Sequence, residues 1–592
     1  MFHQKTGGIK MKKIISFCLL MLLFYSISYA QYPKLGLHGN GGFPNPQLAK
    51  YDMIMNTYMT GSWAQQLKNY NPNMKCLNWG NAYDAVEHGI GIRQLEQWVV
   101  STKPTVLTDS VGTDTITDIY VDDASIFFNP FYFGNDTLRQ FCILQKGDSA
   151  EFPCRVLHVY PSQHKVTISR DPLFIRTHSA GDTVRGCASC WPNIATMNIT
   201  SVCPYGYWNG DTTWTDHWIN NIITYLADTA NAAIDGMLID QLGARVSDQG
   251  SNFGYKFDLN YDGVEENTSY VDSLWRAGAW SILERLHTVF PNKILLTEHE
   301  TWAYNYAQGR TFNGWPWLQT DGGVFGQSGG WVASMKLYSA WNNVAHYSLI
   351  HGGTSLADSN NYNYMRFSLA SCLMGDGYFA FDAGDEAPAL WWFDEYSVDT
   401  SGIATNNYTC KGWLGIPSGN AYPVSSDSLV WRRDFAHGTA LVSYLPHNDS
   451  LWIDLDSNYA RIIGVTDTAH NTGDILNGIW MRGIDSPGRG HGEILFKKNI
   501  ITNCTTLLSD DSHVQIEVYP NPSSDKITIE LQGVTDFQNT KFVLYDGIGR
   551  EMKRMKINKS LTILEQNFPS GMYFYQVKNN KQFISSGKLI VQ

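Results

Sequence analysis

The sequence has few charged residues and no long run of basic ones. Only 17% of its 592 residues are charged, and 55 acidic against 43 basic side chains give a formal net charge of -12. Domains that bind nucleic acids usually cluster lysine and arginine, so this balance argues against a nucleic-acid partner. The 43% share of hydrophobic residues is typical of globular domains and excludes a largely disordered chain.

Long hydrophobic runs are also missing, except for one near the amino terminus. Two lysines precede the apolar run 14–25, and cleavage-compatible residues follow at 28–30. This pattern predicts a signal peptide over residues 1–30, with Met11 as the expected true start. The run is too short for a transmembrane helix, and no other segment is expected to span a membrane, so we expect export of the mature protein.

Cysteine is sparse and unevenly spaced. Nine cysteines remain after the signal peptide, and an odd, scattered set in a large exported chain is not a disulfide framework. Cys187 and Cys190 form a C-x-x-C pair, which is compatible with a redox pair or half of a zinc site. Without a second such pair, we favour a local disulfide or two plain thiols.

Aromatic residues, by contrast, are abundant. The chain has 20 tryptophans, 32 tyrosines and 27 phenylalanines. Flat rings stack on the apolar faces of sugars, which favours a carbohydrate-binding protein, although ordinary cores also use aromatic residues. The length of 592 residues indicates three or four structural units.

The stretch 232–302 is the most informative part of the chain. Two short apolar runs, 232–240 and 293–300, each end in acidic residues, and a helical pattern lies between them. Such runs are typical of buried parallel strands, whose carboxyl ends form the mouth of a barrel. We therefore expect Asp240 and Glu298 to face each other across one pocket. Two carboxylates so placed are the minimum equipment for cleaving a glycosidic bond.

The surrounding rhythm of strands and helices predicts an α/β fold, a (β/α)8 barrel of the TIM type. We assign the barrel to residues 31–104 and 190–425. Its expected strands are at 32–38, 52–58, 74–79, 195–200, 233–240, 293–298, 345–350 and 377–382, with helices at 218–230, 271–290, 331–341 and 364–374.

Three further units are expected around the barrel. Short β-branched runs separated by turn residues predict a small β domain inserted at 105–189. Alternating strands predict a β-sandwich at 426–502. A last unit of β type follows at 512–592.

Several polar and aromatic residues are candidate substrate contacts. His38, Asn56 and Trp79 lie near the ends of expected strands, although each could equally satisfy hydrogen bonds in a loop. The tryptophan-rich loops add four further candidates, because loops at a barrel mouth often contact substrate: Trp208, Trp302, Trp315 and Trp317.

Residues 258–266 resemble the start of a calcium loop. Asp258, Asn260 and Asp262 supply oxygens at the first, third and fifth positions, and Gly263 allows the sharp turn. The glutamate expected at the twelfth position is Ser269, so the loop is not a complete EF-hand. A structural calcium and a turn without metal both remain open, and no cofactor is required for the expected chemistry.

The carboxyl-terminal unit resembles the sorting domain of the type IX secretion system. The resemblance rests on four motifs in order: Tyr-Pro-Asn-Pro at 519–522, Tyr-Asp-Gly-Ile-Gly-Arg at 545–550, Pro-Ser-Gly-Met-Tyr at 569–573 and Gly-Lys-Leu-Ile-Val at 587–591. It implies that the type IX machinery is a partner. It also implies export across the inner and outer membranes, followed by release or attachment at the cell surface.

The body of the chain, residues 32–500, resembles an uncharacterised family of glycosyl hydrolases with a barrel and a trailing β-sandwich. The motifs are at 233–240, 275–278, 367–370, 375–379, 391–396, 414–417 and 431–435. The resemblance implies a carbohydrate substrate. One departure is that an asparagine-rich strand end is expected where this chain has Glu298-His-Glu300.

We assign Asp240 as nucleophile or base and Glu298 as acid, since a glycosidase needs one ionised and one protonated carboxyl group. The alternates are Glu300, Asp321 and Asp382. The acids inside the family motifs, Asp376, Asp394 and Glu395, are expected to be structural.

Two other functions remain open. Residues 326–330 match G-x-S-x-G, so a serine esterase using Ser328 is conceivable, but the residues before it make a poor strand. The other alternative is a secreted carbohydrate-binding or adhesive protein on a barrel that has lost catalysis.

Overall fold

A computed structural model shows the fold of the chain in two compact units, residues 1–504 and 505–592. The residues that it describes are 31–39, 43–82, 84–86, 96–133, 136–138, 140–191, 194–206, 212–240, 242, 246, 257–297, 307, 309–313, 315, 330–342, 347–353, 355–383, 390–406, 408–485, 488–498, 515–519, 523, 526–532, 540–546, 550–557, 561–565, 568–579 and 582–591. Among these residues, no helix combines the length and hydropathy needed to cross a membrane.

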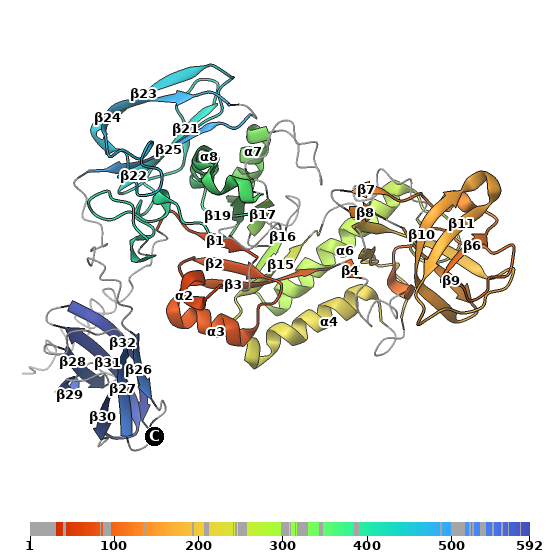
Figure 1. Cartoon of the computed structure of the whole chain (residues 1–592), viewed down its shortest axis with the longest axis horizontal. Coiled ribbons are helices and arrows are strands. Elements are labelled where there is room, and N and C mark those ends of the chain that lie inside the picture. The colour runs from red at the N-terminus through yellow and green to blue at the C-terminus, as the bar shows by residue number, and fades with distance from the viewer. Residues whose placement is uncertain are drawn as a thin grey trace, which may run out of the picture. The chain divides into compact units, whose positions relative to one another are not determined.

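The first unit is organised around an eight-stranded sheet (Figure 1). Its strands, in spatial order, are β1 (Gly36–His38), β2 (Met53–Asn56), β3 (Lys75–Asn81), β15 (Gly236–Asp240), β16 (Ile294–Thr297), β17 (Gly309–Asn313), β18 (Leu349–Gly352) and β19 (Tyr378–Phe381). All neighbouring strands pair in parallel. Leu35, just before β1, also bridges in parallel to Phe379 of β19, so the first strand meets the last.

The helices of this part connect successive strands. They are α2 (Asn45–Leu48), α3 (Gly61–Tyr70), α4 (Trp214–Ala227), α6 (Thr268–Val289), α7 (Gly330–Asn342) and α8 (Tyr362–Leu373). The longest, α6, begins where the Asn267 side chain accepts a hydrogen bond from the Ser269 backbone, and it ends before Pro291. It packs against α4 (Figure 1), and its buried residues include Trp275 and Leu286.

One face of the eight-stranded sheet forms a hydrophobic cluster of its own. Its members come from β2, β3, β15, β16, β18 and β19: Met53, Met55, Leu77, Leu238, Ile294, Leu296, Leu349, Tyr378 and Ala380. Side chains alternate between the two faces of a strand, so this cluster defines the inner face of the sheet. Each buried side chain of this size contributes about 1.5–3 kcal/mol.

One expected barrel strand belongs to a different sheet. Residues 195–200 were expected to re-enter the barrel, but β14 (Ile194–Thr196) pairs antiparallel with β13 (Ser189–Trp191) and β4 (Asp84–Val86). Its place among the parallel strands is taken by β17, which was not among the expected strands. The sequence of β17 is Gly-Arg-Thr-Phe-Asn, which lacks the apolar run on which the strand prediction depends.

A second antiparallel sheet lies between Thr105 and Cys187. Its strands are β5 (Thr105–Val106), β12 (Thr183–Cys187), β9 (Phe141–Lys146), β10 (Ser149–Tyr160), β11 (Lys165–Arg170) and β6 (Ile116–Tyr120), with a separate hairpin of β7 (Phe131–Phe133) and β8 (Asp136–Leu138). It has its own core. Buried Glu151 accepts two 2.6 Å hydrogen bonds from Arg170, which compensates for the burial of both charges.

The carboxyl-terminal part of the first unit differs from the expected sandwich. Its described strands form one antiparallel sheet, here called the sheet domain, in the order β20 (Tyr422–Pro423), β21 (Val430–Asp434), β22 (Gly438–Ser443), β25 (His491–Lys497), β23 (Ser450–Ala460) and β24 (Ile475–Arg482). On one face, Gly492 approaches the backbone of α8 so closely that an added Cβ would lie 2.3 Å from the Arg366 carbonyl oxygen. The other face covers a cluster that includes Ile453, Ile479 and Leu495.

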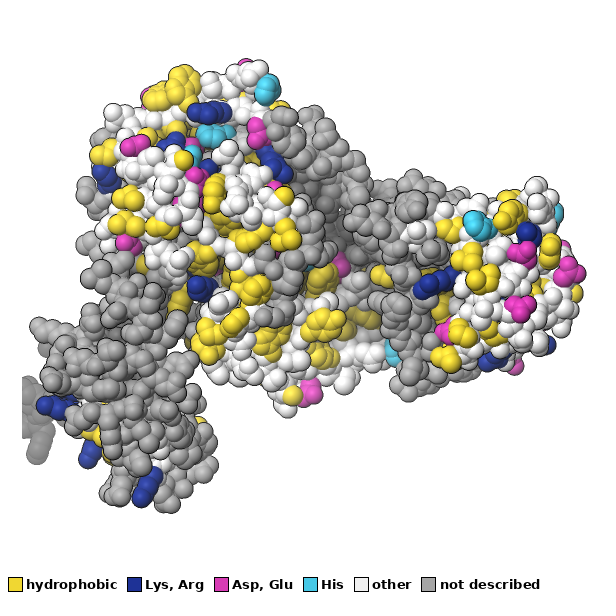
Figure 2. All heavy atoms as spheres, viewed as in Figure 1, with side chains coloured by type: hydrophobic (Ala, Val, Ile, Leu, Met, Phe, Trp, Pro, Cys, Tyr) yellow, Lys and Arg dark blue, Asp and Glu magenta, His cyan; other side chains and the backbone are white. Residues whose placement is uncertain are grey.

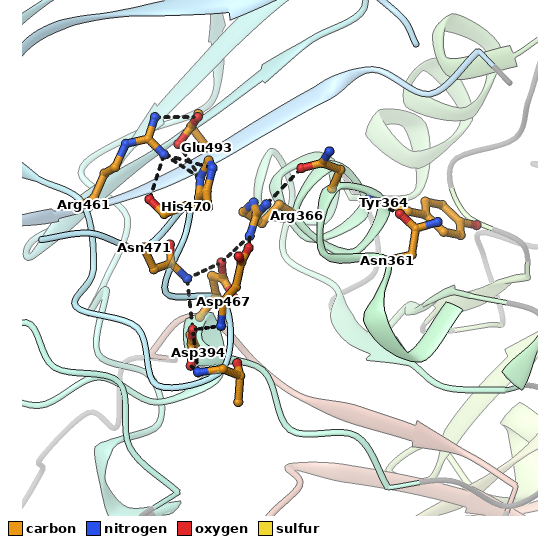
Figure 3. A network of polar contacts seen from close by, with 12 residues as sticks. Asn361, Tyr364, Arg366, Asp394, Arg461, Asp467, His470, Asn471 and Glu493 are labelled. Atoms are coloured by element: carbon orange, nitrogen blue, oxygen red, sulfur yellow. Dashed lines mark hydrogen bonds and ion pairs between the residues drawn. The ribbon is translucent and has the colours of Figure 1, made fainter. Parts of the chain in front are cut away.

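The acids of the family motifs hold the sheet domain against the parallel strands. Asp394 accepts hydrogen bonds from three successive backbone N–H groups, those of Val465, Thr466 and Asp467, at 2.9–3.3 Å (Figure 3). Buried Glu395 lies 3.4 Å from the Arg366 guanidinium. These contacts give Asp394 and Glu395 a structural role.

Asp376 has a similar structural role near the start of the described chain. Its carboxylate accepts a 2.6 Å hydrogen bond from the Tyr32 hydroxyl and a 2.8 Å bond from Arg433 of β21. Burial acts to raise the pKa of Asp376, but the bonds from Tyr32 and Arg433 hold the pKa below its ordinary value. The Asp376 carboxylate thereby joins the segment that contains Tyr32 to strand β21.

The second unit consists of two antiparallel sheets. One contains β26 (Gln515–Tyr519), β27 (Lys526–Gln532) and β30 (Leu561–Glu565), and the other contains β29 (Glu551–Lys556), β28 (Thr540–Asp546), β31 (Gly571–Asn579) and β32 (Gln582–Val591). Residues of both sheets, such as Ile529 and Leu544, share one buried cluster. This is a small β-sandwich.

Candidate active site

Polar side chains occupy the layer next to the inner hydrophobic cluster, at the carboxyl ends of the parallel strands. Asp240 ends β15 two residues after Leu238 of the inner cluster. In the same way, His351 lies two residues after Leu349 in β18, and Asp382 lies two residues after Ala380. Alternation along a strand therefore places all three polar residues on the inner face.

His351 and Asp382 form a buried pair in this layer. The Asp382 Oδ1 atom lies 2.7 Å from His351 Nε2, and each side chain is 4% exposed. This distance is that of a hydrogen bond, so the two side chains hold each other in place. The His351 ring stacks on His38 of β1 with 5.2 Å between centroids, and His38 lies 4.8 Å from the Trp79 ring of β3. Four strands are thereby connected at the carboxyl end of the sheet.

Asp240 is 5% exposed, so its carboxyl group is nearly withdrawn from water. It lies opposite Asn81 of β3 in the parallel register. On the other side, Ile239 pairs with Thr297, the residue that precedes Glu298 in the sequence. Glu298, its alternates Glu300 and Asp321, and Ser328 lie outside the described residues.

Of the expected substrate contacts, His38 and Trp79 lie in the inner polar layer described above. Asn56 does not, because it follows Met55 of the inner cluster and therefore belongs to the opposite face. Its Oδ1 accepts a hydrogen bond from the Tyr58 backbone at 2.7 Å, which is the loop role that the sequence left open.

Trp315 is a core residue. It is fully buried, its indole donates a 3.3 Å hydrogen bond to the Ser368 carbonyl, and its ring packs edge-on against Tyr338. This placement corrects the expectation that Trp315 contacts substrate, because no part of the ring is accessible. Trp208, Trp302 and Trp317 lie outside the described residues.

The residues of the expected calcium loop are bonded to protein groups. Asp258 pairs with Arg185 at 2.7 Å and accepts a 3.0 Å bond from the Gly263 backbone. Asn260 and Asp262 each accept a backbone hydrogen bond within the turn. These contacts use the Oδ2 atom of Asp258, whereas its Oδ1 atom is buried and has no hydrogen-bond partner among the described residues. The structural calcium therefore stays a prediction.

The Cys187 thiol is free and buried, which excludes a local disulfide with Cys190. Burial raises the pKa of the Cys187 thiol well above its ordinary value, so the group is not a reactive thiolate. Among the described residues, no cluster of three or more potential metal ligands occurs.

The sequence interpretation overlooked His351. The available signal was a histidine at the end of the apolar pair Leu349–Ile350, followed by Gly352 and Gly353. Gly353 adopts a φ of +77°, and a Cβ there would lie 2.6 Å from the Asp382 backbone oxygen. A glycine is therefore needed for the chain to turn beside the His351–Asp382 pair.

Comparison with known families tests the resemblances. Residues 180–439, which include β15 to β19 with Asp240, His351 and Asp382, match a family model described as hypothetical glycosyl hydrolase family 15. Residues 517–592 match the secretion system C-terminal sorting domain. Both resemblances are confirmed. The sorting domain indicates export to the cell surface or secretion through the type IX machinery.

Solved structures show only distant likeness. The glycoside hydrolase domain of PelA from Pseudomonas aeruginosa is 10% identical, and the match covers 59% of this chain and 96% of that one, with a TM-score of 0.30. A family GH13_31 enzyme is 8% identical over 79% of this chain and 100% of its own, with a TM-score of 0.38. No curated protein matches the chain.

Proposed function

We propose that the exported protein is a glycoside hydrolase whose eight parallel strands form a (β/α)8 barrel. The observation that carries the proposal is the position of Asp240, a nearly buried carboxyl group on the inner face at the carboxyl end of β15. Catalytic groups of such barrels come from this end of the strands. The glycosyl hydrolase family match over residues 180–439 supports the same class of reaction.

Asp240 and Glu298 are the proposed pair. Glu298 would give its proton to the glycosidic oxygen, so that the bond to the anomeric carbon breaks and its electron pair stays with the leaving sugar. Asp240 would either attack the anomeric carbon or remove a proton from the attacking water. The strand register supports the choice of these two acids. The residues that precede them in the sequence, Ile239 and Thr297, are direct partners in the sheet.

Of the alternates, only Asp382 lies among the described residues, and it is less suited to either role. Its Oδ1 atom is engaged by His351 at 2.7 Å. We therefore propose that Asp382 positions His351, and that His351, His38 and Trp79 contact the bound sugar. Among the proposed contacts, Trp79 supplies an indole ring and the histidines supply ring nitrogens.

The test is the release of reducing ends from a panel of glycans by the mature chain. Asp240→Asn and Glu298→Gln are expected to abolish release without changing the thermal melting temperature. Asp109→Asn, at an exposed acid of the inserted sheet, is the matched control and should keep full activity. Binding without cleavage by the unaltered protein across the panel would instead favour a carbohydrate-binding protein. Loss of activity in Ser328→Ala alone would favour an esterase.

A further inference from the structure

The sheet domain contains a cavity of about 430 Å³. None of its lining residues belongs to the polar layer that contains Asp240. Its walls come from β23, β24, β25, the adjoining loops and the start of α8. Small-molecule sites usually measure roughly 300–1,000 Å³ and combine apolar walls with a few polar groups. This cavity has both kinds of wall.

The apolar wall contains two exposed tryptophans. Trp452 of β23 and Trp480 of β24 are direct partners across the two strands, and their ring centroids lie 5.4 Å apart. They are 43% and 55% exposed, which is unusual for the largest apolar side chain in a molecule with well-formed cores. Adjacent exposed rings of this kind mark a site of interaction.

The Trp452 ring is held in place from two directions. Its indole nitrogen donates a 2.7 Å hydrogen bond to Asp454 Oδ1. On the other side the ring lies against Gly478, where an added Cβ would come within 2.2 Å of it. The indole is therefore already ordered before any ligand arrives, which lowers the entropic cost of stacking a sugar ring on it.

The polar wall is a network centred on Glu493 (Figure 3). The buried carboxylate accepts hydrogen bonds from His470 Nε2 at 3.1 Å, His491 Nε2 at 3.2 Å and Arg461 at 3.2 Å. Burial acts to raise the pKa of Glu493, but the bonds from His470 and His491 hold the pKa well below its ordinary range. Glu493 is thus ionised, and it fixes the orientation of three polar side chains that line the cavity.

The other charged side chains of the cavity are two arginines and one aspartate. Arg482 follows Trp480 on the same face of β24, its side chain is exposed, and its guanidinium has no bonded partner in the described part of the chain. Arg489 also lines the cavity, with its guanidinium 3.9 Å from Asp358. One lining acid, Asp485, accepts a bond from the Arg489 backbone. Over this domain, Figure 2 shows basic and histidine side chains close to hydrophobic ones.

We propose that this cavity binds an acidic sugar residue of a polysaccharide, a pyranose ring that carries a carboxylate or sulfate group. The sugar ring stacks on Trp480, Trp452 borders the same surface with its ring tilted by 61° to that of Trp480, and the anionic group pairs with the Arg482 guanidinium. The site would hold a polymer on the exported protein whether or not Asp240 performs hydrolysis, so it does not rest on the proposed activity.

The test is isothermal titration calorimetry of the mature full chain, residues 31–592, with three hexasaccharides. These are oligogalacturonate, a sulfated carrageenan fragment and uncharged cellohexaose. We expect one or both acidic probes to bind at least tenfold more tightly than cellohexaose, and the stronger acidic probe identifies the preferred anion. Trp480→Ala should weaken that binding at least tenfold. Ile475→Ala, an equally exposed apolar residue of β24 outside the cavity, should leave it unchanged.

Variants at Arg482 test the recognition of charge independently of ring stacking. Arg482→Gln should weaken binding of the acidic probe and flatten its dependence on salt, whereas Arg482→Lys, which keeps the charge, should retain most of both. The proposal is overturned if neither acidic probe binds, if cellohexaose binds as tightly, or if Trp480→Ala binds like the unaltered protein. Circular dichroism of each variant establishes that its fold is intact.

Discussion

Replacing Asp394 by asparagine tests how the sheet domain is attached. The Asp394 carboxylate accepts three backbone N–H groups and the Asn471 side chain. Hydrogen bonds to a charged group contribute about 1.5–3 kcal/mol each, against about 0.5–1.5 kcal/mol for neutral ones. The asparagine NH₂ group would also face the Asp467 and Asn471 donors, so we expect a loss of about 3 kcal/mol in local stability.

The direct assay is hydrogen–deuterium exchange at the amides of Val465, Thr466 and Asp467. A loss of about 3 kcal/mol corresponds to exchange that is faster by roughly 100-fold. Asp474→Asn, at an exposed acid of the same loop, is the control and should leave the rates unchanged. Unchanged exchange in Asp394→Asn would refute the assigned role of this carboxylate.

The same carboxylate predicts a dependence on pH. Burial acts to raise the pKa of Asp394, but the backbone donors outweigh it and hold the pKa below its ordinary value. A depressed pKa in the folded state means that the stabilisation is present above the unfolded value of about 3.9 and is lost as pH falls through the folded value. After correction for the intrinsic pH dependence of amide exchange, the protection of the three amides should therefore fall below about pH 4 in the unaltered protein. In Asp394→Asn this fall in protection should be absent.

Three further outcomes are expected. Asp382→Asn and His351→Phe should show a coupling energy of about 1–3 kcal/mol in a double-mutant cycle of thermal stability, and simple additivity would mean that the pair makes no effective bond. Trp315→Ala should cost about 3–5 kcal/mol because a fully buried ring is removed, whereas an unchanged melting temperature would place the ring outside the core. Removing residues 515–592 should prevent surface delivery in a host with type IX secretion, as measured by cell fractionation, and continued delivery would contradict the role of the sorting domain.

The sequence was most informative where local pattern and burial coincide. The apolar runs that end at Asp240 and before Glu298 predicted adjacent parallel strands, and β15 and β16 do pair in parallel. By contrast, β17 lacks an apolar run, so its pairing with β16 and β18 depends on the neighbouring strands rather than on its own residues. Periodicity alone could not find it.

The site was harder to predict because it depends on which face a residue occupies. Asn56 and Met55 are neighbours in the sequence, but only Met55 belongs to the inner cluster. The pairing of His351 with Asp382 joins residues 31 positions apart, and no spacing rule connects them. The cavity beside Trp452 and Trp480 likewise needs the three-dimensional register of β23 with β24.

The central claim is that Asp240 takes part in the bond-breaking step. The most direct measurement is kcat of Asp240→Asn on the best glycan substrate of the unaltered protein, with the melting temperature of both proteins recorded. We predict a loss of at least about 100-fold at an unchanged melting temperature, because a positioned acid or base contributes roughly 10²–10⁴-fold to the rate. A folded Asp240→Asn protein with the kcat of the unaltered protein would contradict the proposed mechanism.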